Sequence, residues 1–423
     1  MTAAILAVVL VALLGAPLFA VLAAVTFLLY QAEGIDFGSV AVEMYRLAEN
    51  PLLIAIPMFT FAGYLLAESQ APRRLVTVSR ALLGWMPGGL AIVSLVACAV
   101  FTAFTGASGV TIIAVGGLLL PALLAERYPP RFTYGLLTTS GSLGLLFPPS
   151  LPIILFGFVA GVSIDKLFAA GAIPGILLVV LLGAYAARAS LVTGVPRQRF
   201  SWAAFRSSVR EAAWEIPLPI VVVAGIYSGK VTVTEAASLT AVYALVVEVL
   251  VYRDVKLRAL PRVLTESMVL VGGILLILAV ALALTNYFIA AEIPLRLFDW
   301  IQNYIHSRAV FLVLLNVFLL IVGCLMDIFS ATLVVVPLIA PVALAYGVDP
   351  VHLGIIFLTN LEIGYSTPPV GLNLFIASLR FERPIVELYR ASLPFLGLYL
   401  LALMVITYVP ALSLWLVEVL GVR

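Results

Sequence analysis

Charged residues are scarce in this chain. Asp, Glu, Lys and Arg make up only 10% of its 423 residues, whereas 64% are hydrophobic. Soluble domains carry about 25% charged residues, so the composition excludes an ordinary soluble protein and predicts a polytopic membrane protein. The formal net charge of only +2 also gives no reason to expect a nucleic-acid partner.

Cysteine and histidine are nearly absent, with two residues of each. Cys98 and Cys324 lie alone in separate apolar segments, which excludes a disulfide framework and does not suit a metal site. We expect both to be small packing residues. His306 and His352 lie near the ends of apolar segments, where we expect surface residues rather than proton relays.

Three sequence motifs are incomplete in this chain: a cleaved signal peptide, a phosphate-binding loop and the active-site motif of an intramembrane protease. Met1 and Thr2 lead directly into an apolar run without a basic region, so a cleaved signal peptide is not expected. Gly225–Val231 (GIYSGKV) is one residue too short for a phosphate-binding P-loop and lacks Ser or Thr after its lysine. Gly106–Gly109 (GASG) is similar to the GxSG motif of rhomboid proteases, which need a histidine from another transmembrane helix. Because both histidines are expected on the opposite side of the membrane from this motif, we do not expect an enzyme.

Long and short apolar segments fill most of the chain and predict an all-α fold. They cover roughly 3–30, 51–66, 90–105, 109–124, 132–147 with 151–162, 167–188, 216–228, 235–252, 267–291, 309–326, 331–345, 353–366 with 371–379, and 393–417. Several have about 15 residues, fewer than the roughly 20 that a spanning helix needs. The short segments form pairs joined at FTGASG (104–109) and MDIFSAT (326–332), which predicts two re-entrant hairpins, one in each half.

A polar stretch interrupted by two prolines occurs twice. Thr138–Ser150 reads TTSGSLGLLFPPS, and Leu358–Val370, 220 residues later, reads LTNLEIGYSTPPV. When 121–157 is aligned with 341–377, the residues that match are Pro121, Leu124, Ala125, Pro130, Thr139, Gly144, Pro148 and Pro149. Interrupted helices at corresponding places in two halves are typical of the binding site of a secondary transporter. Unwound backbone at membrane depth is tolerated only where it is buried in protein or lines a cavity.

The basic residues predict how the two halves are oriented. Five groups hold 17 of the 23 Lys and Arg residues: Arg73, Arg74 and Arg80; Arg127 and Arg131; Arg188, Arg197, Arg199, Arg206 and Arg210; Arg253, Lys256, Arg258 and Arg262; and Arg380, Arg383 and Arg390. Placing these groups in the cytoplasm satisfies the positive-inside rule. The first hairpin then starts and ends on the cytoplasmic side and the second on the outer side. The halves are therefore expected to be inverted repeats, as alternating access around a central site requires.

The sequence also predicts how the first apolar segment and three amphipathic stretches lie relative to the membrane. The first apolar segment either crosses once or breaks at Gly15-Ala16-Pro17 into two short passes, and comparison with the second half favours the break and an outer N-terminus. Amphipathic stretches at 72–83, 256–264 and 294–304 are expected to lie along the membrane interface.

The two breaks are the strongest candidates for an ion site. Proline removes a backbone donor and clashes with the carbonyl one turn earlier, so each Pro-Pro pair frees carbonyls around Gly144–Phe147 and Gly364–Thr367. Four carbonyls and a hydroxyl would suit Na⁺, and Ser108 with the carbonyls of the first hairpin tip (102–111) could also ligate a hard cation. The alternatives are a kink satisfied by neighbouring Ser and Thr side chains and, at the tip, a tight glycine-rich turn.

Two acids at the expected membrane depth, Asp327 and Glu362, are candidate coupling residues, since an ionisable residue there is a functional hypothesis by default. The alternative for Asp327 is that it caps the helix beginning near Ile328, and a structural role is equally open for Glu362. Asn373, in the apolar run after the second break, is a candidate contact for substrate or for a helix end.

Over nearly its whole length the chain resembles the large membrane subunit of TRAP (tripartite ATP-independent periplasmic) transporters. The motifs that carry the resemblance are PLLIAIPMFTFAGYLLAES (51–69), FTGASGVT (104–111), GLLFPPS (144–150), GIYSGKVTVTEAASLTAVYALVVE (225–248), MDIFSATLVVVPLIAP (326–341) and STPPVGLNLF (366–375). One departure is Lys230-Val231-Thr232-Val233, where the family more often has an apolar residue followed by Phe-Thr-Pro.

The resemblance implies an elevator transporter of the ion-transporter-superfamily type, in which a transport domain slides against a scaffold. It implies scaffold parts at 1–84 and 191–304 and transport-domain parts at 85–190 and 305–423. Such subunits lie in the bacterial inner membrane and import organic acids, commonly C4-dicarboxylates or sialic acids, with a Na⁺ gradient. A periplasmic binding protein delivers the substrate, and a small four-helix membrane subunit, for which this chain has no room, braces the scaffold.

The resemblance also implies site residues. One Na⁺ site would use Ser108, Gly144, Phe147 and Pro149, largely through backbone carbonyls, and the other would use Gly323, Gly364, Thr367 and Val370. Substrate would lie between the hairpin tips, near Thr139, Ser140, Asn360 and Asn373.

Two other functions remain open at this stage. The first is a Na⁺- or H⁺-coupled organic-anion symporter of the same superfamily that works without a binding protein. The second is a passive channel or a structural membrane component, which is disfavoured because no continuous polar helix face lines a pore. The sequence does not name the solute, since specificity in the family resides largely in the separate binding protein.

Overall fold

The structure is a computed structural model that describes residues 8, 10–12, 14–195 and 199–421. The described residues form helices and no strands. In chain order the elements are α2 (Leu18–Glu33), α3 (Gly38–Glu49), η1 (Pro51–Ile54), α4 (Ala55–Glu68), α5 (Ala71–Leu83), α6 (Gly89–Thr105), α7 (Ser108–Thr111), η2 (Ile112–Gly116), α8 (Gly117–Ala125), α9 (Pro130–Ser140), η3 (Leu143–Leu146), α10 (Leu151–Ala160), α11 (Ile164–Thr193), α12 (Trp202–Glu211), α13 (Pro217–Tyr227), α14 (Val233–Leu245), η4 (Val246–Val251), η5 (Leu257–Ala259), α15 (Leu260–Ala290), α16 (Ile293–Gln302), α17 (Arg308–Leu325), α18 (Ile328–Ala345), α19 (Pro350–Gly364), α20 (Leu372–Phe381), α21 (Ile385–Tyr408) and α22 (Ala411–Leu420).

The helices confirm a polytopic membrane protein. Within the described ranges, eight helices are long and apolar enough to cross a membrane, and the bent pair formed by α9 and α10 raises that number to nine. The first apolar segment does break, because a turn at Leu14 and Gly15 precedes α2, which begins after Pro17. Most residues before this turn lie outside the described residues.

The same order of elements occurs twice, 220 residues apart. Adding 220 to the bounds of α6 gives 309–325, and α17 covers Arg308–Leu325. Adding 220 to Ser108–Ala125, the span of α7 to α8, gives the bounds of α18, Ile328–Ala345. The broken pair of α9 and α10 likewise corresponds to α19 and α20. The sequence repeat is therefore also a repeat of helical structure.

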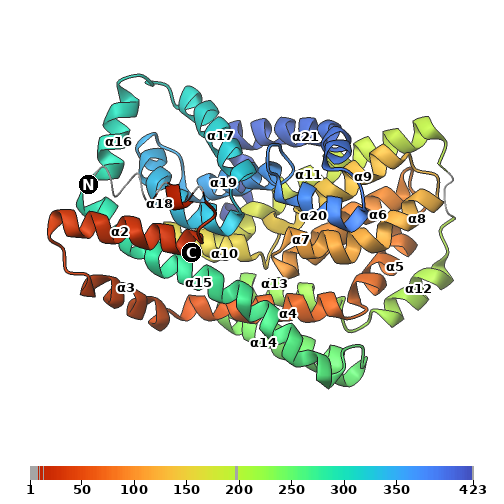
Figure 1. Cartoon of the computed structure of the whole chain (residues 1–423). Helices are drawn as coiled ribbons and strands as arrows, with labels where there is room; N and C mark the ends of the chain where they lie inside the picture. The colour runs from red at the N-terminus through yellow and green to blue at the C-terminus, as the bar shows by residue number, and fades with distance from the viewer. Residues whose placement is uncertain (1–7, 9, 13, 196–198, 422–423) are drawn as a thin grey trace.

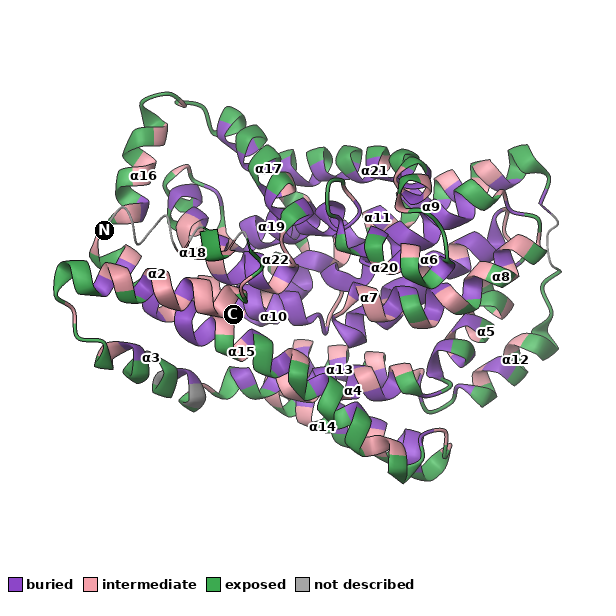
Figure 2. Cartoon of the chain, viewed as in Figure 1, coloured by how far each residue is buried: buried purple, intermediate pink, exposed green. Residues whose placement is uncertain are grey.

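The helices form two groups. Figure 1 shows α2, α3, α4, α14 and α15 along one side of the molecule, and the hairpins, broken helices, α11 and α21 in the other part. In the first group α4 packs against α14 and α15, and in the second α17 packs against α19, α9 against α21, and α10 against α18. Burial is densest in the second group, where α10 and α19 are mostly purple in Figure 2.

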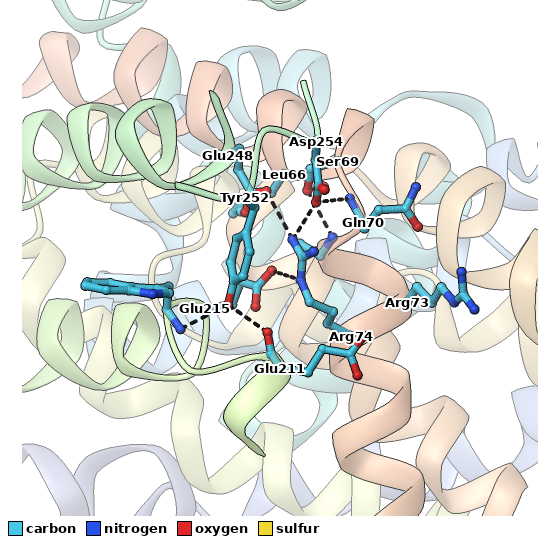
Figure 3. A network of polar contacts seen from close by, with 12 residues as sticks. Leu66, Ser69, Gln70, Arg73, Arg74, Glu211, Glu215, Glu248, Tyr252 and Asp254 are labelled. Atoms are coloured by element: carbon cyan, nitrogen blue, oxygen red, sulfur yellow. Dashed lines mark hydrogen bonds and ion pairs between the residues drawn. The ribbon is translucent and has the colours of Figure 1, made fainter. Parts of the chain in front are cut away.

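A buried charge cluster lies at the start of the helix that connects the two groups. Amphipathic α5 leads from α4 to the first hairpin, and its Arg74 contacts three carboxylates (Figure 3). The guanidinium lies 2.7 Å from Asp254 and 3.2 Å from Glu248, and it also pairs with Glu215. The ring of Tyr252 lies 3.9 Å from the guanidinium carbon. The beginning of α5 is thereby fixed to the residues just before α13 and to η4 and the turn that follows it.

Three expectations from the sequence were wrong. The stretch at 256–264 is not a separate interfacial helix, since η5 runs directly into α15. The segment at 393–417 begins earlier and is divided at Pro410 into α21 and α22. His352 is fully buried rather than at the surface, and its ring nitrogens each lie 3.2 Å from an oxygen, one of Ser413 and one of Thr407. His306 is exposed, as expected.

Candidate functional site

Both proline-containing stretches interrupt their helices, as predicted. After α9 ends at Ser140, the chain forms the short 3-10 turn η3 and is not helical again until α10 begins at Leu151, bending by 47°. After α19 ends at Gly364, α20 begins at Leu372. The Pro148–Pro149 and Pro368–Pro369 peptide bonds are both cis.

The tip of the first hairpin packs against the first break. Thr102 at the end of α6 donates a hydrogen bond of 2.7 Å to the carbonyl of Gly141, and its hydroxyl also lies 2.7 Å from that of Thr111. The backbone approach is close at Gly144, where an added Cβ would lie 2.2 Å from the carbonyl oxygen of Ala99. The glycine is required there because no larger residue leaves room for α6.

The tip of the second hairpin packs against the second break in a similar way. An added Cβ at Gly364 would lie 2.4 Å from the backbone of Gly323 in α17. The backbone N–H of Ile328 donates to the Tyr365 hydroxyl at 2.7 Å, and the N–H of Gly371 donates to the carbonyl of Cys324 at 3.2 Å. Each hairpin therefore contacts the break of its own repeat.

The two breaks also meet each other. The Ser142 hydroxyl lies within hydrogen-bond distance, 3.4 Å, of the Glu362 carbonyl oxygen. These residues occupy equivalent positions, since they are 220 apart. Tyr399 of α21 donates to the carbonyl of Thr139 at 3.0 Å, close to the same crossing. The first hairpin tip reaches the second repeat, because an added Cβ at Gly109 would lie 2.5 Å from the Ile376 side chain.

Buried polar atoms without hydrogen-bond partners gather in the broken helices. Among the described residues these are the hydroxyls of Thr138, Ser140, Ser150 and Ser366, one carboxylate oxygen of Glu362, the amide oxygen of Asn360, and both polar atoms of the Asn373 amide. Buried polar groups in native proteins are nearly always satisfied, so these atoms are available to a bound ion, solute or water. Oxygen atoms of hydroxyl, amide and carbonyl groups are the ligands that Na⁺-like hard cations prefer.

The residues expected at the first ion site lie around the first hairpin tip and break. Ser108 begins α7 and is buried, and its carbonyl would lie 3.3 Å from a Cβ at Gly141. Gly144 contacts α6, while the Phe147 ring packs against Gly175 of α11. Pro149 is buried within the break.

The residues expected at the second ion site are brought together only in part. Gly323 and Gly364 touch through their backbones. Thr367 follows in the break, with its hydroxyl donating to the carbonyl of Ile363 at 2.8 Å. Val370 lies at the exposed end of the break, where its side chain is 40% exposed.

The residues expected near substrate differ in whether their polar side-chain atoms already have hydrogen-bond partners. The Thr139 hydroxyl turns back onto its own helix and donates to the carbonyl of Gly135 at 2.8 Å, which uses its proton but leaves its oxygen able to accept. Ser140 and Asn373 are fully buried with unpartnered polar atoms. The amide nitrogen of Asn360 donates to Asn316 and to the Ile356 carbonyl, both at 2.8 Å, which leaves its oxygen free.

The two acids have different surroundings. Asp327 caps α18, since one carboxylate oxygen accepts from the backbone N–H groups of Phe329 and Ser330 at 3.0 Å. Its capping role is confirmed. Glu362 is 1% exposed at the crossing of the broken helices, and one of its oxygens lies 3.5 Å from the Tyr399 hydroxyl.

Sequence reasoning missed the residues that hold the tips in place. Thr102, Tyr365 and Tyr399 contribute hydrogen bonds between elements that are distant in the chain. Thr102 and Tyr365 lie within or beside the polar motifs, which was an available signal. Tyr399 lies in the apolar helix α21, where the sequence offers no signal of its role.

Comparison with known proteins identifies the family. Residues 4–412 match the family described as "Tripartite ATP-independent periplasmic transporter, DctM component". The chain belongs to this family. It is therefore a multi-pass membrane component of a transporter and not an enzyme.

Individual relatives agree with this assignment. The "C4-dicarboxylate TRAP transporter large permease protein DctM" of Pseudomonas aeruginosa is 37% identical over 399 residues, 94% of this chain and 93% of the relative. The ectoine/5-hydroxyectoine TRAP transporter large permease protein UehC of Ruegeria pomeroyi is 35% identical, covering 86% of this chain and 85% of the relative. The isethionate TRAP transporter permease protein DctMQ of Oleidesulfovibrio alaskensis is 34% identical over 86% of this chain, but over only 58% of that longer protein.

A solved structure shares the fold. The YdaH transporter of Alcanivorax borkumensis superimposes with a TM-score of 0.57 over 90% of this chain and 87% of that chain. At 15% sequence identity the likeness concerns the fold alone.

Proposed function

We propose that the chain is the Na⁺-coupled large permease subunit of a TRAP transporter that imports an organic acid across the bacterial inner membrane. The observation that carries the proposal is the pair of broken helices, each closed by its own hairpin tip and lined with unpartnered buried polar atoms. Discontinuous helices meeting near mid-membrane are the usual place for substrate and coupling ions in secondary transporters.

The proposed ion sites follow the two repeats. Ser108, Gly144, Phe147 and Pro149 would form the first, and Gly323, Gly364, Thr367 and Val370 the second, mainly through backbone carbonyls. Substrate would lie between the tips near Thr139, Ser140, Asn360 and Asn373.

The proposed mechanism is an elevator with inverted repeats. The hairpin and broken-helix parts at 85–190 and 305–423 would move as one body against scaffold parts at 1–84 and 191–304. In support, α6 begins at the end of the molecule that holds α5 and α12, whereas α17 follows α16 at the opposite end (Figure 1). Hairpins that start from opposite ends are what an inverted repeat requires.

The proposed partners are a periplasmic substrate-binding protein and a small four-helix membrane subunit. The substrate is a carboxylate of the C4-dicarboxylate or sialic-acid kind, or another organic acid, and the relatives named for isethionate and ectoine widen the candidates. Reconstitution of the chain with both partners under an inward Na⁺ gradient tests the proposal.

We expect uptake that requires both Na⁺ and the binding protein. Uptake by the chain alone, without a binding protein, would instead show a self-sufficient symporter. Uptake that is indifferent to Na⁺ would refute the proposed coupling.

A further inference from the structure

Helix α12 presents aromatic and basic side chains to the outside of the protein. Trp202, Arg206 and Arg210 are spaced by four residues and therefore share one face. All three are exposed, and so are Arg199 and Phe200 immediately before the helix. The exposed fraction of Trp202 is 67%. Much of α12 is green in Figure 2.

The arginines on this face have no acidic partners. Among the described residues, no ion pair or hydrogen bond engages the side chains of Arg199, Arg206 or Arg210, whereas Arg74 and Arg262 each pair with carboxylates. The surface therefore carries three positive charges without an ion-pair partner within a stretch of chain equal to about three helical turns.

The aromatic residues form one cluster beside these charges. The rings of Phe200, Trp202 and Phe205 lie with centroids between 5.4 and 6.4 Å apart. A cluster of large exposed aromatic side chains leaves apolar surface in contact with water, which is typical of a site that contacts a partner or a membrane. They suit the boundary between lipid headgroups and acyl chains, where their apolar bodies and the charged groups are both accommodated.

The opposite face of α12 is held firmly to the protein. Ser208 is buried and the helix packs against α5. At its end, Tyr252 donates to the carbonyl of Glu211 at 2.7 Å and accepts from the Trp214 N–H at 3.4 Å. Glu215, which follows, belongs to the Arg74 cluster (Figure 3). The exposed face is thus a fixed surface and not part of a loose tail.

We infer that the exposed face of α12 is a docking surface for anionic lipid headgroups. Guanidinium groups bind phosphate oxygens with paired hydrogen bonds, and a basic amphipathic helix in the interface attracts anionic lipids. The helix lies at the same end of the molecule as α5, which carries Arg73, Arg74 and Arg80 (Figure 1). Positive-inside reasoning expects the cytoplasmic leaflet and its negative surface there. The inference rests on this surface and does not depend on Na⁺ coupling or on the proposed substrate.

Quenching of Trp202 fluorescence by brominated lipids tests the inference. The full-length protein is reconstituted into vesicles with brominated phosphatidylglycerol or brominated phosphatidylcholine at equal total bromine. The difference between wild type and Trp202→Phe isolates the Trp202 signal from the other four tryptophans. We expect stronger quenching by the anionic lipid, with local enrichment of roughly fivefold for each arginine at the surface.

Two variants and a salt series make the result decisive. The triple variant Arg199→Gln, Arg206→Gln, Arg210→Gln should lose the preference for phosphatidylglycerol. The matched control Arg253→Gln, Lys256→Gln, Arg258→Gln removes the same charge from exposed residues elsewhere at this end and should retain it. If the triple variant does not fold, rising salt should weaken the preference in wild type, because exposed charges are screened.

Three outcomes would overturn the inference. Equal quenching by the two lipids would show insertion without headgroup recognition. Absence of quenching by either lipid would place the face away from the bilayer and favour an acidic protein partner. A preference that survives in the triple variant, or that does not respond to salt, would assign the selectivity to other residues.

Discussion

At the scale of single residues, glycine backbones make the contact between hairpin tips and breaks. Gly144 and Gly364 leave no room for a Cβ, and in both cases the nearest obstructing atom is a backbone atom of the neighbouring hairpin, which cannot rotate away. A substitution there changes the distance between the carbonyls that we propose as ion ligands.

Gly364→Ala should reduce Na⁺-driven uptake by the reconstituted complex at least tenfold. An added Cβ would lie 2.4 Å from the Gly323 backbone, so the tip must move away from the break. A displacement of about 1 Å at a positioned site costs on the order of 10²-fold. Gly397→Ala is the matched control, because no atom lies within 4 Å of its added Cβ. Equal uptake by the two variants would contradict the proposed role of this contact.

Ser108→Ala should raise the Na⁺ concentration for half-maximal uptake by roughly tenfold. A hydrogen-bonding or ligating group directed at a charge contributes about 1.5–3 kcal/mol, and the buried side chain offers no other described function. Val180→Ala, on the exposed face of α11, controls for loss of side-chain volume. If both variants respond to Na⁺ as wild type does, the Ser108 hydroxyl is not a ligand.

Glu215 should make stability depend on pH. Burial raises the pKa of its carboxyl, while the hydrogen bond and charge of Arg74 lower it less strongly. Because the folded-state pKa is raised, the protonated form is favoured in the fold. The contribution of Glu215 to the free energy of unfolding is fully present below the pKa that this carboxyl has in the unfolded chain. It is lost as the pH rises through the higher pKa of the folded state. Thermal unfolding midpoints should therefore fall with rising pH in wild type, and Glu215→Gln should flatten this slope. An unchanged slope would show that other groups are responsible.

At the scale of elements, α5 is held unequally at its two ends. At its start, the Arg74 side chain is 8% exposed and surrounded by three carboxylates. Towards its end, Arg80 pairs with Glu126 at 2.7 Å with 44% of its side chain exposed. Removing one partner of a buried ion pair destabilises a protein far more than removing one partner of an exposed pair. The connector should therefore stay with the scaffold at its start.

Arg74→Gln should lower the free energy of unfolding by about 3–5 kcal/mol, because it leaves buried carboxylates without a cation. Arg80→Gln is the matched control on the same helix and should cost at most about 1 kcal/mol. Denaturant titrations of the two proteins in lipid nanodiscs measure the difference. Similar values would mean that the cluster does not fix α5.

The elements show what sequence could and could not predict here. The two breaks, the hairpin tips and the Asp327 cap were predicted because Pro-Pro pairs, glycine-rich turns and an acid before a helix act locally. Helices α3 and α12 were missed because their charged residues resemble loops. Burial of His352 was also missed, since apolar neighbours in a membrane protein can face either lipid or protein. The packing of α19 against α22 shows that His352 faces protein rather than lipid.

The same limit applies to the candidate site. The family resemblance placed Ser140, Asn360 and Asn373 near the substrate, and all three are buried, with the Ser140 hydroxyl, the Asn360 amide oxygen and both polar atoms of the Asn373 amide lacking hydrogen-bond partners. The sequence did not reveal that the Thr139 hydroxyl bonds to the carbonyl of its own helix. A threonine inside a helix can either bond to the carbonyl one turn earlier or point away from the helix, and the sequence does not decide between the two. Tyr399, 260 residues from its Thr139 partner, was beyond any local pattern.

At the scale of the whole molecule, the account depends on two repeats meeting at one centre. The 220-residue spacing relates the hairpins, the breaks and the pair Ser142 and Glu362 that joins them. If ions are bound at this centre, their movement must accompany that of the solute. Coupling of this kind is a property of the assembled transporter and not of any single residue.

The most direct measurement is simultaneous uptake of radioactive sodium and of labelled solute by the complex with its binding protein and small subunit. The account predicts that binding protein loaded with solute starts both fluxes together, in a fixed ratio, and that Gly364→Ala lowers both. Solute entry without sodium entry, or sodium entry that continues without solute, would contradict it.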